Sequence, residues 1–172
     1  STHIMRELLN DPVYRQHLEG RGHHQCVVIG YSDSNEEDGP CASRFATHQA
    51  QRALAVTLAA EAESFLIFHA RGGSVARGGG RVDTLVRATP VEAVNGELRF
   101  TEQGEAIQQS YGLRAIAMRT LERSFNALTT CTSAARRGAL GPDRPDHLEC
   151  ANTIATASRR TYRALVREEP EF

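Results

Sequence analysis

The sequence predicts a helix-rich α/β fold with about three parallel strands and long helices in its C-terminal part. Residues 25–31 and 64–68 are short apolar runs typical of buried strands, and a segment with helical spacing of apolar residues lies between them. Alternation of strands and helices implies parallel pairing. With 172 residues, 40% of them hydrophobic, the chain is long enough for one domain with its own core.

The elements of the N-terminal half are delimited by capping and breaking residues. Asp11 followed by Pro12 is typical of an N-cap with proline at the first helical position, and this helix is expected to end near Gly20. After the first strand come the polar residues 32–35 and then the turn Gly39-Pro40. A helix is predicted over about 41–63, and the strand that follows it is expected to carry His69 at its tip.

The C-terminal half is expected to be mainly helical. In order, the predicted elements are a short helix at 82–88, a third strand at 97–100, a helix through 108, a helix through 137 and a final helix from 146 toward 167. Tyr111-Gly112 marks the break between two of these helices. Asp146 and Glu149 have the spacing of a capping box, which predicts the start of the last helix.

Composition excludes several classes of protein. A net charge of -1 and 6% aromatic residues argue against a dedicated nucleic-acid binder. No apolar run reaches the length of a membrane span or of a signal-peptide core, so we expect a cytoplasmic protein without a membrane partner. The four cysteines form no CxxC pair and are expected to be reduced and mostly buried. All 20 basic residues are arginines, which excludes a lysine Schiff base supplied by this chain.

A glycine-rich segment after the second strand is the best candidate for a ligand site. It begins with His69 and Arg71, continues through Gly72 and Gly73, and carries a second arginine, Arg77. Glycines allow backbone N–H groups to converge on an anion, and arginines add bidentate donors for phosphate or carboxylate. The segment has neither the Walker lysine nor a GxGxxG fingerprint. It predicts an oxyanion or phosphate site, with a flexible glycine linker as the alternative.

Polar side chains follow the carboxyl ends of all three expected strands. Asp33 follows the first strand, His69 the second, and residues 101–105 the third. In parallel α/β folds, ligands bind at this edge of the sheet. Three strands do not close a barrel, so the pattern predicts part of a larger structure.

Several motifs together closely resemble the phosphoenolpyruvate carboxylase family, in the same order and with the same spacing. They are Gly30-Tyr31-Ser32-Asp33-Ser34-Asn35, the segment 68–79, Val94-Asn95-Gly96, 101–105 and Tyr111-Gly112. The resemblance covers essentially residues 1–172. It implies a partial (β/α) barrel, with the whole chain forming a single fragment that corresponds to the later part of the eight-stranded barrel of a much longer enzyme.

The family reaction carboxylates phosphoenolpyruvate with bicarbonate, through carboxyphosphate and an enolate, to give oxaloacetate and phosphate. By resemblance, Asp33 would be one of two carboxylate ligands of Mg²⁺ or Mn²⁺. His69 would take the carboxyphosphate proton, while Arg71 and Arg77 would act catalytically by holding phosphate and carboxylate oxygens. Gly72 and Gly73 would complete the substrate-binding loop together with the two arginines.

Each assignment has a structural alternative. Asp33 could be a solvated turn residue or a helix cap, and a histidine at a strand end is often a hydrogen-bonded structural group. Glu102 and Glu105 could line the rim, but carboxylates also favour a helix N-terminus for structural reasons.

The sequence also departs from the family pattern. Glu36 stands where the family has a cation, Ala70 and Ala76 stand at usual glycines, and Ser110 stands at a usual lysine. A charge reversal beside an anionic substrate reduces its affinity. These changes fit a divergent enzyme or a relative that has lost activity.

The resemblance implies that other parts of the enzyme are needed for turnover. The family's second metal carboxylate, a further histidine and further arginines fall outside the matched stretch, so residues 1–172 alone are expected to bind substrate weakly and not to turn over. Expected partners are phosphoenolpyruvate, bicarbonate, the rest of a carboxylase chain or a complementary subunit, and further copies in a homo-oligomer. The alternatives are a non-catalytic carboxylase-like module that binds an anionic metabolite or a partner protein, and one subunit of a split enzyme.

Overall fold

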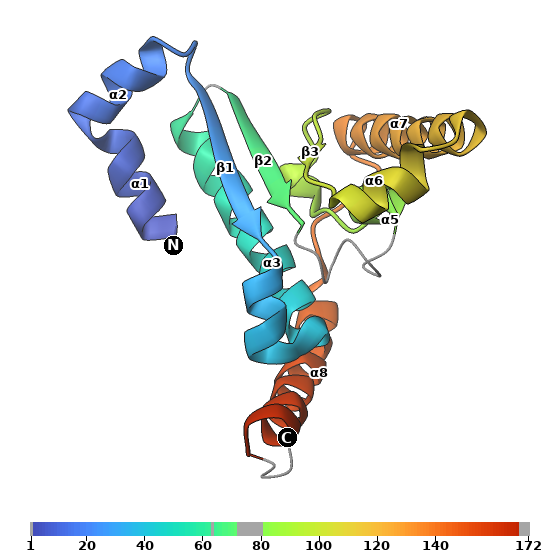
Figure 1. Cartoon of the computed structure of the whole chain (residues 1–172). Coiled ribbons are helices and arrows are strands. Elements are labelled where there is room, and N and C mark those ends of the chain that lie inside the picture. Colours follow the sequence, from blue (N-terminus) through green and yellow to red (C-terminus); the bar gives the residue numbers. More distant parts are fainter. Residues whose placement is uncertain (1, 63, 72–80, 169–172) are drawn as a thin grey trace.

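A parallel sheet of three strands, in the order β1-β2-β3, lies at the centre of the computed structural model, which describes residues 2–62, 64–71 and 81–168 (Figure 1). The strands are β1 (His24–Gly30), β2 (Ser64–Ala70) and the short β3 (Arg99–Phe100). β1 and β2 pair along their full length, from His24 opposite Ser64 to Gly30 opposite Ala70. The expected helix-rich α/β fold with three parallel strands is confirmed, and the sheet is not closed.

Helices cover one face of this sheet. Alternate side chains of a strand point to opposite faces, and Ile29 and Ile67 share the face that packs on Leu54 and Leu58 of α3 (Ser32–Glu61). Figure 1 shows α3 behind β1 and β2, with no helix drawn in front of these two strands. On the other face Val28 is 59% exposed. Parallel sheets are normally covered on both faces, so the described residues leave this one without its usual cover.

The long helix α3 starts earlier than the sequence predicts. The expected helix over about 41–63 is present, but helical structure already begins at Ser32, directly after the strand. Gly39 interrupts it with a φ of 78°, a conformation that glycine adopts without a steric penalty. Pro40 follows and opens the second part, since a proline at the start of a helix sacrifices no internal hydrogen bond.

Two short helices precede the sheet. They are α1 (Thr2–Asn10), which contacts α3, and α2 (Pro12–Glu19). The predicted cap of α2 is confirmed, because the Asp11 carboxylate accepts hydrogen bonds from the backbone N–H groups of Val13 and Tyr14 at 2.9 and 3.0 Å.

The C-terminal half is helical, as predicted. Its elements are α5 (Val82–Arg87), η1 (Val91–Ala93), α6 (Gly104–Tyr111), α7 (Arg114–Arg136), α8 (Pro145–Arg163) and η2 (Ala164–Glu168). α7 packs on α5 and α6, while α8 runs beside α3 (Figure 1). No helix within the described residues has both the length and the apolar content needed to cross a membrane.

Two local expectations are wrong. The capping box does not form, because α8 starts with Pro145 at its first position and Asp146 pairs with the Arg144 side chain at 2.7 Å instead. The cysteines are free, as expected, but they are not mostly buried: Cys41 and Cys150 are exposed on helix surfaces, and Cys26 and Cys131 are half-buried.

The end of α8 packs against the break in α3. The ring of Tyr162 lies so close to Gly39 that a Cβ there would come within 2.7 Å of its Cγ. Arg163 and Arg159 bind the Asp38 carboxylate at 2.7 and 3.0 Å. The position of the first part of α3 is therefore fixed by the last turns of α8.

Candidate functional site

The carboxyl ends of β1 and β2 bring Tyr31, His69 and Arg71 together. The register places Ile29 opposite His69, so Tyr31 and Arg71 come next on the same, helix-covered side. The Tyr31 hydroxyl and the Nδ1 atom of His69 form a hydrogen bond of 2.7 Å. Gln51 of α3 donates to the same hydroxyl oxygen at 3.4 Å. Tyr31, Gln51, His69 and Arg71 are all buried, so this is an internal polar network and not a surface cluster.

Burial keeps both members of the central hydrogen bond neutral. Removal from water, reinforced by the positive charge of Arg71, lowers the pKa of His69 to about 4. Burial also raises the pKa of Tyr31 to about 12, although Arg71 and the hydrogen bond from Gln51 act in the opposite direction. At neutral pH the site therefore contains a neutral imidazole, a neutral phenol and one buried guanidinium.

Arg71 is only 3% exposed and is anchored by the segment that follows β3. Its guanidinium lies 3.8 Å from the Glu102 carboxylate, and its carbonyl accepts a hydrogen bond from the Thr101 hydroxyl at 3.2 Å. The Thr101 N–H donates to the His69 carbonyl at 3.0 Å. Burial and the nearby Glu102 charge raise the pKa of Tyr111, with Arg71 opposing them. The segment after β3 thus contacts the end of β2 at His69 and Arg71.

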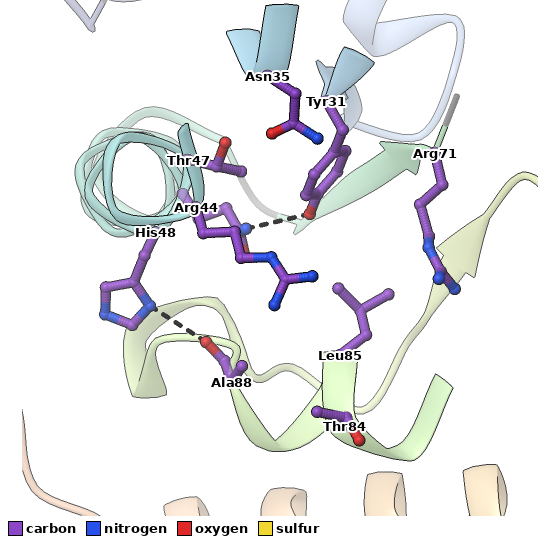
Figure 2. A pocket seen from close by; sticks show the side chains of 10 residues that line it. Tyr31, Asn35, Arg44, Thr47, His48, Arg71, Thr84, Leu85 and Ala88 are labelled. Atoms are coloured by element: carbon purple, nitrogen blue, oxygen red, sulfur yellow. Dashed lines mark hydrogen bonds between the residues drawn. The ribbon is translucent and has the colours of Figure 1, made fainter. Parts of the chain in front are cut away.

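A cavity of about 130 Å³ lies between this network and the helices α3 and α5 (Figure 2). It is lined by Tyr31, Asn35, Arg44, Thr47, His48, Gln51, Arg71, Thr84, Leu85 and Ala88. These ten residues include two arginines and no aspartate or glutamate. The arrangement suits a small anion, because guanidinium groups in a partly enclosed site bind phosphate and carboxylate groups.

His69 lies deeper than the sequence predicts. It was expected at the tip of the strand, but β2 continues to Ala70 and the imidazole points to the side of the sheet covered by helices, where it is 3% exposed. A small cleft on this side is lined by His69 together with Val86 and Thr89. Of the hydrogen-bonded pair Tyr31 and His69, only Tyr31 lines the cavity of about 130 Å³.

Asp33 lies apart from this network. It is exposed in the first turn of α3 and does not line the cavity. Within the described residues no three His, Cys, Asp or Glu side chains converge as a metal site. A carboxylate is the ligand type that Mg²⁺ prefers, but one such group is an incomplete set.

The remaining predicted positions are divided between described and undescribed segments. Gly72, Gly73, Ala76 and Arg77 lie outside the described residues. Ser110 lines a groove that also contains Arg71. Two further departures from the family pattern are described: Ala70 is the last residue of β2, and Glu36 is exposed on α3, with its carbonyl accepting a hydrogen bond from Tyr162 at 3.4 Å.

Sequence reasoning missed most of the cavity wall. Arg44, Thr47, His48 and Gln51 follow one another at helical spacing on α3 and face the same space. A polar stripe at i, i+3, i+4 and i+7 inside a helix that packs on a sheet was the signal that could have revealed them. Tyr31 could have been found from its position two residues beyond Ile29.

Fold and site together define an α/β protein with a cationic pocket at the carboxyl ends of parallel strands. Comparison with known proteins identifies the family of this α/β protein. The family model "Phosphoenolpyruvate carboxylase" matches residues 1–172. A phosphoenolpyruvate carboxylase of Xanthomonas euvesicatoria pv. vesicatoria is 43% identical over 171 residues, which are 99% of this chain and 19% of that protein. Those of Rhodothermus marinus and Mycobacterium avium are 39% and 38% identical over 169 residues, which are 98% of this chain and 18% of each relative.

The chain belongs to the phosphoenolpyruvate carboxylase family. It spans about a fifth of the length of the curated relatives it matches.

Proposed function

We propose that this chain forms part of the active site of a phosphoenolpyruvate carboxylase, a lyase that carboxylates phosphoenolpyruvate with bicarbonate to give oxaloacetate and phosphate. The observation that carries the proposal is the buried Arg71, held at the ends of β2 and β3 and lining a cavity whose described lining residues include no carboxylate. A guanidinium in such a low-dielectric position interacts strongly with an anionic substrate.

The uncovered face of the sheet supports a partial (β/α) barrel. Cys26, Val28 and Phe68 belong to this face, which is apolar and faces away from α3. In a barrel such side chains would lie in the interior, packed against the other strands. The remaining strands would come from the rest of the carboxylase chain or from a complementary subunit, in a cytoplasmic homo-oligomer.

Arg71 and, by resemblance, Arg77 with Gly72 and Gly73 hold the phosphate and carboxylate oxygens of phosphoenolpyruvate. His69 belongs to the carboxylation step, in which it would accept the carboxyphosphate proton. Its low pKa makes the imidazole a weak base while the site is empty. An anion beside Arg71 would offset the positive charge that helps to lower this pKa, so bound substrate would make His69 more basic.

Asp33 is the residue of this chain that would bind Mg²⁺ (or Mn²⁺). When bound, the ion would supply positive charge to an enolate oxygen. Because no three His, Cys, Asp or Glu side chains converge among the described residues, further ligands must come from elsewhere in the assembled enzyme. Residues 1–172 alone would therefore not form the complete metal site.

A second candidate function is a non-catalytic module that binds an anionic metabolite or a partner protein. It is favoured by Glu36 and Ser110, which replace cations of the family pattern, and by Ala70, which replaces a glycine. Under either proposal residues 1–172 alone do not form oxaloacetate. A coupled assay that detected turnover by the purified chain would contradict this expectation.

The proposed function is tested by calorimetric titration of the chain with phosphoenolpyruvate in the presence of Mg²⁺. We expect weak binding that Arg71→Gln weakens by at least about tenfold, the factor that corresponds to about 1.4 kcal/mol. The control is Arg87→Gln, which removes an exposed arginine at the end of α5 and is expected to bind as the wild type does. A folded wild-type chain that does not bind phosphoenolpyruvate would disprove the proposal for this stretch.

A further inference from the structure

Arg44, which lies outside the family motifs named above, points into the same cavity as Arg71 (Figure 2). We infer that Arg44 is a second anion-binding residue of this site and that a small anion binds between Arg44 and Arg71 through its phosphate or carboxylate group. The inference builds on the proposed function, because it adds a recognition residue to the same pocket.

The geometry of α3 places Arg44 at the cavity. Arg44 lies on the stripe with Thr47, His48 and Gln51, all of which line this space. Figure 2 shows its guanidinium directed into the cavity from the α3 side, while Arg71 approaches from the end of β2. Two cationic groups that come from different elements can contact two sides of one anion.

The surroundings of the cavity favour an anion over other ligands. Two carboxylates near the cavity are paired with side chains that line it: Glu102 lies 3.8 Å from Arg71, and Asp143 lies 2.7 Å from His48. Neither carboxylate lines the cavity itself. The hydroxyl groups of Thr47 and Thr84 and the amide of Asn35 add neutral donors to the wall. A site with this set of groups recognises a compact anion by charge and by hydrogen bonds.

α3 presents a positive charge to the cavity at Arg44 and not at Glu36. The family pattern has a cation at that position, whereas the Glu36 side chain here is exposed and absent from the cavity wall. Arg44 lies further along α3, beyond the break at Gly39, and brings a positive charge to the cavity from the second part of the helix. The pocket therefore has a cation from α3 at Arg44, while Glu36 contributes no charge to its wall.

The test is a calorimetric titration of the full chain with inorganic phosphate and, separately, with acetate, both without a divalent metal. We expect millimolar binding of at least one of the two ions, and the comparison of the two shows whether phosphate or carboxylate is preferred. Arg44→Gln is expected to weaken this binding by about tenfold, and Arg44→Lys, which keeps the charge, by less. The control Arg87→Gln is expected to bind as the wild type does.

Arg44 is exposed, so we expect its variants to fold, which the urea midpoint of each variant checks. Unchanged affinity in a folded Arg44→Gln variant, or a folded wild type that binds neither ion, would overturn the inference. The proposed function has a separate outcome: if phosphate binding depends on Arg44 but phosphoenolpyruvate does not bind, the anion site stands and the carboxylase assignment fails. If Arg71→Gln abolishes phosphoenolpyruvate binding and Arg44→Gln changes no affinity, only the role of Arg44 is lost.

Discussion

His69 has a structural role in the fold beside the chemical role proposed for it. Its imidazole is buried and hydrogen-bonded to the Tyr31 hydroxyl. This agrees with the alternative that a histidine at a strand end is a hydrogen-bonded structural group. The same burial, together with Arg71, keeps the ring neutral, which a proton acceptor must be before it acts. The arrangement therefore makes the stability of the chain depend on the protonation of this residue.

The stability of the chain should fall as the pH decreases from about 6.5 to about 4. In this interval the unfolded chain protonates His69, whose ordinary pKa is near 6.5, while the folded chain with a pKa of about 4 does not. The free energy of unfolding attributable to this residue decreases by up to about 3 kcal/mol across the interval. Urea unfolding at several pH values should show a smaller decrease for His69→Gln than for the wild type. His3→Gln, which changes an exposed histidine, serves as the control, and equal slopes for wild type and His69→Gln would contradict the prediction.

At the level of elements, α3 and α8 depend on each other. The break at Gly39 separates the part of α3 that carries Asp33 and Asn35 from the part that carries Arg44 and Gln51. Tyr162 covers this break, so the packing of α8 determines the angle between the two parts. Side chains of both parts line the cavity, and its shape therefore depends on a contact outside it.

Replacing Gly39 by alanine should destabilise the chain by about 2–4 kcal/mol. An alanine there would have to adopt a positive φ, and its Cβ would clash with the Tyr162 ring. Gly104→Ala is the matched control, since the first position of α6 has open space and no positive φ. Chemical denaturation monitored by circular dichroism measures both changes. Similar unfolding midpoints for the two variants would show that the break does not need glycine.

At the level of the whole molecule, apolar surface remains on two sides. One is the uncovered face of the sheet around Val28, and the other is a stripe on α7 formed by Met118, Leu121 and Phe125, all exposed. Exposed apolar groups at helical spacing usually mark a contact with another part of a protein. In a chain that spans about a fifth of its relatives' length, these surfaces are where the rest of the carboxylase is expected to pack.

Phe125→Glu should reduce self-association of the purified chain without lowering its stability. Phe125 is 71% exposed, so the change removes apolar surface from solvent contact and does not open the core. Sedimentation at several protein concentrations measures the effect. Val13→Glu, which alters an equally exposed residue on α2, is the control and should associate as the wild type does. Association that is unaffected by Phe125→Glu would remove α7 from the list of contact surfaces.

The sequence was sufficient to predict the elements whose ends carry strong local signals. Asp11 and Pro12 defined the start of α2, and the apolar run of β1 was found to within one residue. The early start of α3 was missed, because serine and aspartate after a strand also favour a turn. The burial of His69 was missed for a different reason: it depends on the strand extending to Ala70, which pairing with β1 and β3 decides. Arg44 belongs to none of the motifs named above. Only its position on a helix that packs on the sheet indicates that it lines the cavity.

The contact between α8 and the first part of α3 has a thermodynamic consequence. Tyr162 reaches the Glu36 carbonyl across 126 positions of sequence, while Asn35, one residue earlier, lines the cavity. If a ligand that contacts Asn35 binds more tightly when α8 is docked, it favours docking by the same factor by which docking raises its affinity. The contact at Glu36 would then couple α8 energetically to the pocket, although no α8 residue is among those that line the cavity.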